Sequence, residues 1–77
     1  MSKISFEEFA SEFSKDLEIE DQEFINLPLK DIPEYDSMGI ITVSLTIERL
    51  FNFEISLEVL DESESLKILY DYCVKNS

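Results

Sequence analysis

Apolar residues recur at intervals of three and four along most of the chain, the spacing that puts side chains on one face of an α-helix. The first such segment spans about residues 5–18, and its apolar stripe consists of Phe6, Phe9, Ala10, Phe13 and Leu17. On the opposite side, predicted to face water, are Glu7, Glu8, Ser11 and Ser14. The pattern predicts an amphipathic helix that packs against a core through its aromatic stripe.

The periodicity fails between about residues 18 and 35, where Asn26, Pro28, Asp31 and Pro33 interrupt the sequence. Such residues are typical of turns, so a long connecting loop is predicted here. The segment is nevertheless too apolar for a loop surrounded by water. We expect its larger side chains to lie across the bundle, namely Phe24, Ile25, Leu27, Leu29 and Ile32.

The longest amphipathic segment follows and predicts a helix over about residues 37–52. At about 100° per residue, one face forms a buried stripe, made of Ile40, Val43, Ile47, Leu50 and Phe51. Met38, Ile41 and Leu45 cluster on the opposite side, where a small bundle normally exposes polar residues. They form either an interaction surface, which we favour, or a surface covered by the preceding loop. Glu48, Arg49 and Asn52 continue this face in polar form.

After an extended connection at residues 53–57, residues 57–61 predict a short helical turn. The last helix is predicted over about residues 64–75, with Lys67 and Lys75 outside and a buried stripe of Leu66, Leu69, Tyr70, Cys73 and Val74. The fold class is therefore all-α, with three main helices, a short fourth helix and a long loop between the first two. Seventy-seven residues suit a single domain.

A net charge of −12 argues against nucleic acid and favours basic partners. The chain has one cysteine, Cys73, and no histidine, so neither an internal disulfide nor a Cys/His metal site can form. Cys73 is expected to be a small core residue. No segment is apolar enough for a signal peptide or a membrane span, and we expect a cytoplasmic monomer that does not bind membranes.

An acidic cluster could suggest calcium, and consists of Asp16, Glu18, Glu20, Asp21 and Glu23. It lacks the ligand spacing and the glycine turn of a calcium-binding helix–loop–helix motif. A solvated acidic loop is the better interpretation, and no metal is expected.

Asp36 and Ser37 stand directly before the longest helix and have the pattern of a helix start. The Asp36 carboxylate can accept hydrogen bonds from the first turn, and Ser37 is placed at the positive end of the helix dipole. The pair is either an ordinary cap or a seat for a phosphate group. A catalytic serine needs a neighbouring base, and the usual one, histidine, is absent. We therefore expect a non-enzymatic module with Ser37 as a point of attachment.

Asp36-Ser37-Met38 resembles the Asp-Ser-Leu/Met attachment motif of the acyl carrier proteins. Residues 36–56, which include Phe51-x-x-Glu54-Ile55, resemble the second helix of that family and the segment after it. Residues 64–72 resemble its last helix. The resemblance therefore extends over nearly the whole chain.

The resemblance implies that Ser37 is esterified by 4'-phosphopantetheine, whose thiol carries acyl groups as thioesters. Asp36 would help a phosphopantetheinyl transferase to position Ser37. Met38, Ile41 and Leu45 would form the apolar part of the docking face, and Glu48 a charged contact. Further implied partners are acyl-activating, acyl-transfer or condensing enzymes with basic docking surfaces, in fatty acid, polyketide or polysaccharide biosynthesis.

Several positions depart from the pattern of fatty-acid carriers. Gly39, Thr42 and Arg49 stand where the family commonly has carboxylates, and Ser44 where an apolar residue is frequent. The segment Asp31-Ile32-Pro33-Glu34-Tyr35 is closer to stand-alone carriers of specialised pathways. Met38-Gly39 is also similar to D-alanyl carrier proteins. Two alternatives stay open: an aminoacyl carrier, and an unmodified acidic adaptor that only docks partners.

Overall fold

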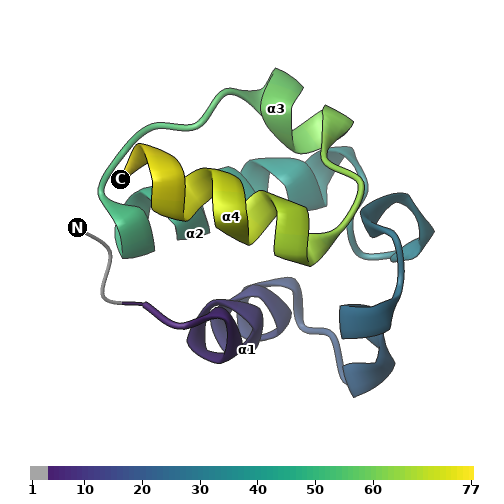
Figure 1. The fold of residues 1–77 in the computed structure, drawn as a ribbon. Coiled ribbons are helices and arrows are strands. Elements are labelled where there is room, and N and C mark those ends of the chain that lie inside the picture. Colours follow the sequence, from purple (N-terminus) through teal and green to yellow (C-terminus); the bar gives the residue numbers. More distant parts are fainter. Residues whose placement is uncertain (1–3) are drawn as a thin grey trace.

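A computed structural model describes residues 4–77 and shows a small bundle of α-helices (Figure 1). The elements follow one another as α1 (Phe6–Leu17), η1 (Gln22–Asn26), η2 (Leu29–Asp31), α2 (Ser37–Phe51), α3 (Leu57–Glu62) and α4 (Leu66–Asn76), where η marks a 3₁₀ helix. The predicted all-α class is confirmed, as are three longer helices, one short helix and a long connection between α1 and α2. Within residues 4–77, no helix is long and apolar enough to cross a membrane.

Each α-helix begins at a residue whose side chain accepts a hydrogen bond from the first turn. Ser5, Ser56 and Ser65 cap α1, α3 and α4 through their hydroxyl groups, and Asp36 caps α2 through its carboxylate. Such caps satisfy backbone N–H groups that have no partner inside the helix. The helix starts are therefore encoded locally, which explains why the sequence pattern places them within about two residues.

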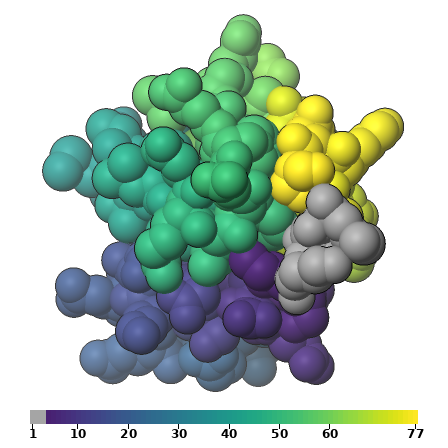
Figure 2. Space-filling view, turned by 90° about the vertical axis from the view of Figure 1, so that its left-hand side faces the viewer, coloured from purple at the N-terminus to yellow at the C-terminus, as the bar shows by residue number. Residues whose placement is uncertain are grey.

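The core forms where the aromatic stripe of α1 meets the other helices. Phe9 and Phe51 bring α1 and α2 together with ring centres 5.6 Å apart, and Phe13 stacks on Phe24 of the loop at 5.7 Å. The fully buried side chains of the bundle are Phe9, Phe13, Leu29, Val43, Ile47, Leu60, Leu66, Leu69 and Cys73. Figure 2 shows the end of α2 and the segment after it, in green, packed between α1 below and the end of α4 beside it.

The connection between α1 and α2 is ordered by its own contacts rather than being a free loop. The backbone N–H of Leu29 donates to the carbonyl of Glu64 at 2.9 Å, and the Tyr35 hydroxyl donates to the carbonyl of Leu60 at 2.7 Å. Phe24, Leu29 and Ile32 are buried, as predicted. These contacts fix the segment that leads into α2, and so they fix the start of that helix.

Three groups of side chains differ from the predictions. Ser14 is buried rather than exposed, because its hydroxyl donates to the Ser11 carbonyl of its own helix at 3.0 Å and so needs no water. Ile25 and Leu27 do not lie across the bundle but remain 40% and 39% exposed, since the 3₁₀ turn directs only Phe24 inward. Val74 is 38% exposed because it lies at the edge of the α4 stripe, about 80° around the helix from Leu66.

Candidate functional site

Ser37 is the first residue of α2, and it is exposed. Asp36 precedes it in an extended conformation, and its carboxylate oxygen Oδ1 accepts a hydrogen bond from the Gly39 backbone N–H at 2.9 Å. The Asp36 carbonyl also accepts the first backbone hydrogen bond of the helix, from Ile40 at 2.8 Å. The predicted cap is confirmed. The Ser37 hydroxyl is thus displayed at the positive end of a helix of 15 residues.

Gly39 allows the preceding turn to pack directly against the first turn of α2. It is buried, and a Cβ atom built on it would overlap the carbonyl oxygen of Glu34 and lie 3.1 Å from the carbonyl carbon. The same atom would be 3.4 Å from Leu17 Cδ2 of α1. Only glycine leaves this space, so Gly39 sets how closely residues 34–36 approach the helix. The hydrophobic pattern does not reveal this role, and the one signal for it in the sequence is that Gly39 is the single glycine in the chain.

Three large apolar side chains next to Ser37 are exposed and are named here the α2 strip: Met38, Ile41 and Leu45. Their exposed fractions are 74%, 48% and 62%. The interpretation that the preceding loop covers this face is therefore wrong. At about 100° per residue the three side chains lie within about 60° of arc, on the side opposite the buried Val43 and Ile47. Glu48, also exposed, extends the strip by one turn.

Arg49 borders the α2 strip, but it is engaged by α1. Its Nη2 atom donates to Glu12 Oε1 at 3.1 Å and to Asp16 Oδ2 at 2.8 Å. These hydrogen bonds, to Glu12 and then to Asp16, raise the pKa of the guanidinium group. Asp16 Oδ2 also accepts a hydrogen bond from the buried Thr46 hydroxyl. These hydrogen bonds connect α1 to α2 along one edge of the α2 strip.

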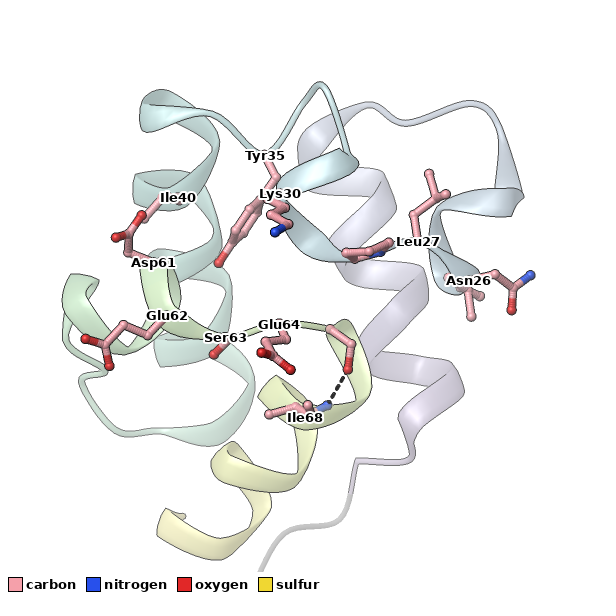
Figure 3. Close-up of a pocket in the computed structure, with 13 residues that line it drawn as sticks. Asn26, Leu27, Lys30, Tyr35, Ile40, Asp61, Glu62, Ser63, Glu64 and Ile68 are labelled. Atoms are coloured by element: carbon pink, nitrogen blue, oxygen red, sulfur yellow. Dashed lines mark hydrogen bonds between the residues drawn. The ribbon is translucent and has the colours of Figure 1, made fainter.

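A cleft of about 830 Å³ opens between the α1–α2 connection, the start of α2 and the α3–α4 junction (Figure 3). Its apolar lining includes the two exposed loop residues Ile25 and Leu27, together with Ile40 and Ile68. Lys30 and Glu64 face the same space from opposite sides. Periodicity alone does not resolve the depth of a pocket between the second and third helices, which depends on how Val43, Ser44, Ile47, Leu60 and Leu66 pack. Four of these are fully buried, all except Ser44, and none of the five lines this cleft.

Tyr35 closes the inner end of the cleft. It is 8% exposed, and its hydroxyl is held by the Leu60 carbonyl. Burial, with a smaller contribution from the nearby Asp61 carboxylate, raises the pKa of this hydroxyl above its ordinary value. Burial thus favours the neutral hydroxyl, and its hydrogen bond to Leu60 links the loop to α3.

Two further groups singled out in the sequence are Cys73 and the acidic cluster. Cys73 is fully buried in the core, as predicted, and burial raises the pKa of its thiol to about 12. Among residues 4–77, no group of three or more His, Cys, Asp or Glu side chains could hold a metal ion. Within the acidic cluster, Asp16 accepts hydrogen bonds from Arg49 and Thr46.

No protein-family model, curated protein or solved structure matches the chain.

Proposed function

We propose that the protein is an acyl carrier that holds acyl or aminoacyl groups as thioesters on a 4'-phosphopantetheine arm attached to Ser37. The observation that carries this proposal is the position of Ser37, exposed at the first residue of α2 and directly beside the exposed α2 strip. A large partner enzyme can reach the hydroxyl there and can bind next to it. The resemblance of the Asp36-Ser37-Met38 motif to carrier attachment sites supports the same function.

The start of α2 fits the phosphodiester that this attachment would create. Ser37 would carry the group through its Oγ atom, and the positive end of the helix dipole favours a negative charge there by about 0.3–1 kcal/mol. Asp36 shapes the site because its carboxylate fixes the first turn through Gly39. The arm would supply a thiol whose thioester keeps the acyl carbon reactive for transfer.

The attachment reaction needs a partner, because Ser37 stands in a chain that contains no histidine to act as its base. A phosphopantetheinyl transferase would supply coenzyme A and the base. The Ser37 oxygen would form a bond to the phosphorus next to pantetheine, the pyrophosphate bond would break, and adenosine 3',5'-bisphosphate would leave. The hydroxyl proton would pass to the base of the transferase.

Acyl-activating enzymes and acyl-transfer or condensing enzymes would then load and unload the arm. The charge of −12 suits basic docking surfaces on these partners and is the wrong sign for nucleic acid. Met38, Ile41, Leu45 and Glu48 are proposed to contact the partners. Ile40, one turn after Ser37, lines the cleft, so the arm would start near a space that can receive part of its cargo. A cytoplasmic protein of a specialised pathway fits these features.

Incubation with a broad-specificity phosphopantetheinyl transferase and coenzyme A tests the proposal. Intact-mass measurement should show one phosphopantetheine added to the wild-type chain and none added to Ser37→Ala. Ser44→Ala, in the same helix, is the matched control and should be loaded like the wild type. If the wild-type chain gains no mass, the carrier proposal is wrong.

The alternative of an unmodified adaptor predicts a different result in the cell. Loss of function in Ser37→Ala supports a carrier, because an adaptor would tolerate that change. If Ser37→Ala keeps full function while Met38→Glu or Leu45→Glu loses it, the adaptor is favoured.

A further inference from the structure

The end of the large cleft that lies away from α2 exposes apolar side chains. In Figure 3, Ile40 and Asp61 lie on one side of the cleft, and Leu27 lies on the other, next to η1. Ile25 and Leu27 are 40% and 39% exposed, and Ile68 of α4, which lines the same cleft, is 49% exposed. These three side chains are named here the η1 patch. Apolar side chains that stay exposed around one cleft are typical of a binding surface.

A second cleft, of about 500 Å³, adjoins the first, because Leu27 lines both. Its lining includes five carboxylates and no lysine or arginine among the described residues, the carboxylates being those of Glu18, Glu20, Asp21, Glu23 and Glu34. Three further carboxylates line the large cleft beside one cation, Lys30, namely those of Asp61, Glu62 and Glu64. Eight of the 18 carboxylate residues in the chain therefore surround the η1 patch, with one of its six cations.

These eight carboxylates are available to a basic partner. The ion pairs within residues 4–77 involve Glu12, Asp16 and Asp71, and none of the eight. In the same part of the chain the acidic groups do not converge on a site that could hold a metal ion. Cations that arrive on separate side chains of one protein suit such a spread arrangement better than a single ion.

The backbone around the large cleft favours an occupant that binds through its side chains. The Leu29 N–H already donates to the Glu64 carbonyl, and Pro28, which has no N–H, forms an isolated bridge with Ser65. An added strand would find little backbone to pair with, whereas an amphipathic helix can lay its apolar face into a groove. A second copy of the chain is a poor occupant, because two chains of charge −12 repel each other.

We propose that the η1 patch is a docking surface for a basic amphipathic helix of a partner protein. The apolar side chains of that helix pack on Ile25, Leu27 and Ile68, and its Lys or Arg side chains lie against the carboxylates of the two clefts. Apolar burial supplies the affinity, and the carboxylates supply orientation and a faster association. This surface is separate from the α2 strip and does not require Ser37 to be modified.

A synthetic helical peptide tests the proposal, with leucines along one face and arginines on both sides of them. Titrated at low salt into the isotope-labelled, unmodified chain, it should shift the backbone amide signals of the η1 patch and of residues 61–64 more than those of the α2 strip. A peptide with serines in place of the leucines should bind at least about tenfold more weakly. If the serine peptide binds equally well, or if the shifts centre on the α2 strip, the inference is overturned.

A matched pair of variants locates the apolar contact. Leu27→Gln should weaken binding of the leucine–arginine peptide about fivefold, because the exposed part of this side chain is no longer buried favourably. Leu57→Gln is the control, since Leu57 of α3 is 50% exposed and lines neither cleft. It should bind within about twofold of the wild type, and an equal loss in the two variants would overturn the inference.

A second pair locates the charged contact. Glu62→Gln combined with Glu64→Gln should weaken binding about fivefold, at about twofold for each exposed ion pair. Glu54→Gln combined with Glu58→Gln removes the same charge outside both clefts and should stay within about twofold. Equal losses would mean that net charge alone acts, which overturns the inference. None of these results depends on Ser37, so the loading assay decides the carrier proposal separately.

Discussion

Replacing Gly39 with alanine tests how the structure holds the start of α2. In an exposed helix the change would stabilise by about 1 kcal/mol. Here the added Cβ overlaps the Glu34 carbonyl oxygen, a backbone atom, and would lie 3.1 Å from its carbon. Overpacking of this kind costs about 1–3 kcal/mol, and the depth of the overlap places Gly39→Ala at the upper end. We therefore expect a net loss of about 2 kcal/mol.

The assay is denaturation by heat or urea, followed by circular dichroism. For a chain of this size a loss of about 2 kcal/mol lowers the Tm by about 8–16 °C. Ser44→Ala is the control, since it adds no atom, and it should stay within about 0.5 kcal/mol of the wild type. Because the overlap pushes residues 34–36 away, loading of Ser37 should also slow. A Gly39→Ala variant as stable as the wild type, or more stable, would refute the proposed role of this glycine.

Three further outcomes are expected. Arg49→Gln should lower the Tm at low salt, with a smaller difference at high salt, because its pairs with Glu12 and Asp16 are exposed to screening; an unchanged Tm at low salt would contradict this. The raised pKa of Tyr35 means that the unfolded chain loses the hydroxyl proton first, so the stability from this group is full below about pH 10 and declines above it. Above about pH 10 the urea midpoint should fall less steeply with pH in Tyr35→Phe than in the wild type. Equal slopes would contradict this role of Tyr35. With its pKa raised to about 12, Cys73 should react with a disulfide reagent at pH 8 far more slowly in the native than in the unfolded protein, and equal rates would show that the thiol is accessible.

The helices could be predicted because their signals are local. Asp36 accepts a hydrogen bond from Gly39, three residues later, and the α1 stripe repeats within single turns. The exposed α2 strip was found in the same way, from a helical wheel alone. No contact with distant residues is needed to define these features.

What could not be predicted depends on contacts between segments far apart in the sequence. The space around Gly39 is set by Glu34 and Leu17, and the engagement of Arg49 by two residues of α1. A helical wheel places Arg49 on the outward face of α2, but it does not show which other helix lies beside that face. The cleft likewise forms only when the α1–α2 connection meets the α3–α4 junction.

The Tyr70 hydroxyl donates to the Ile4 carbonyl at 2.7 Å, which holds the first described residue against α4. Figure 1 shows the start of the described chain and the end of α4 on the left, the side of the molecule where α2 finishes. Ser37 lies at the opposite end of α2, a helix of 15 residues that is about 22 Å long at about 1.5 Å per residue. A fluorophore or a surface anchor attached at the end of α4 should therefore leave the serine accessible, which suits immobilised or single-molecule assays of loading.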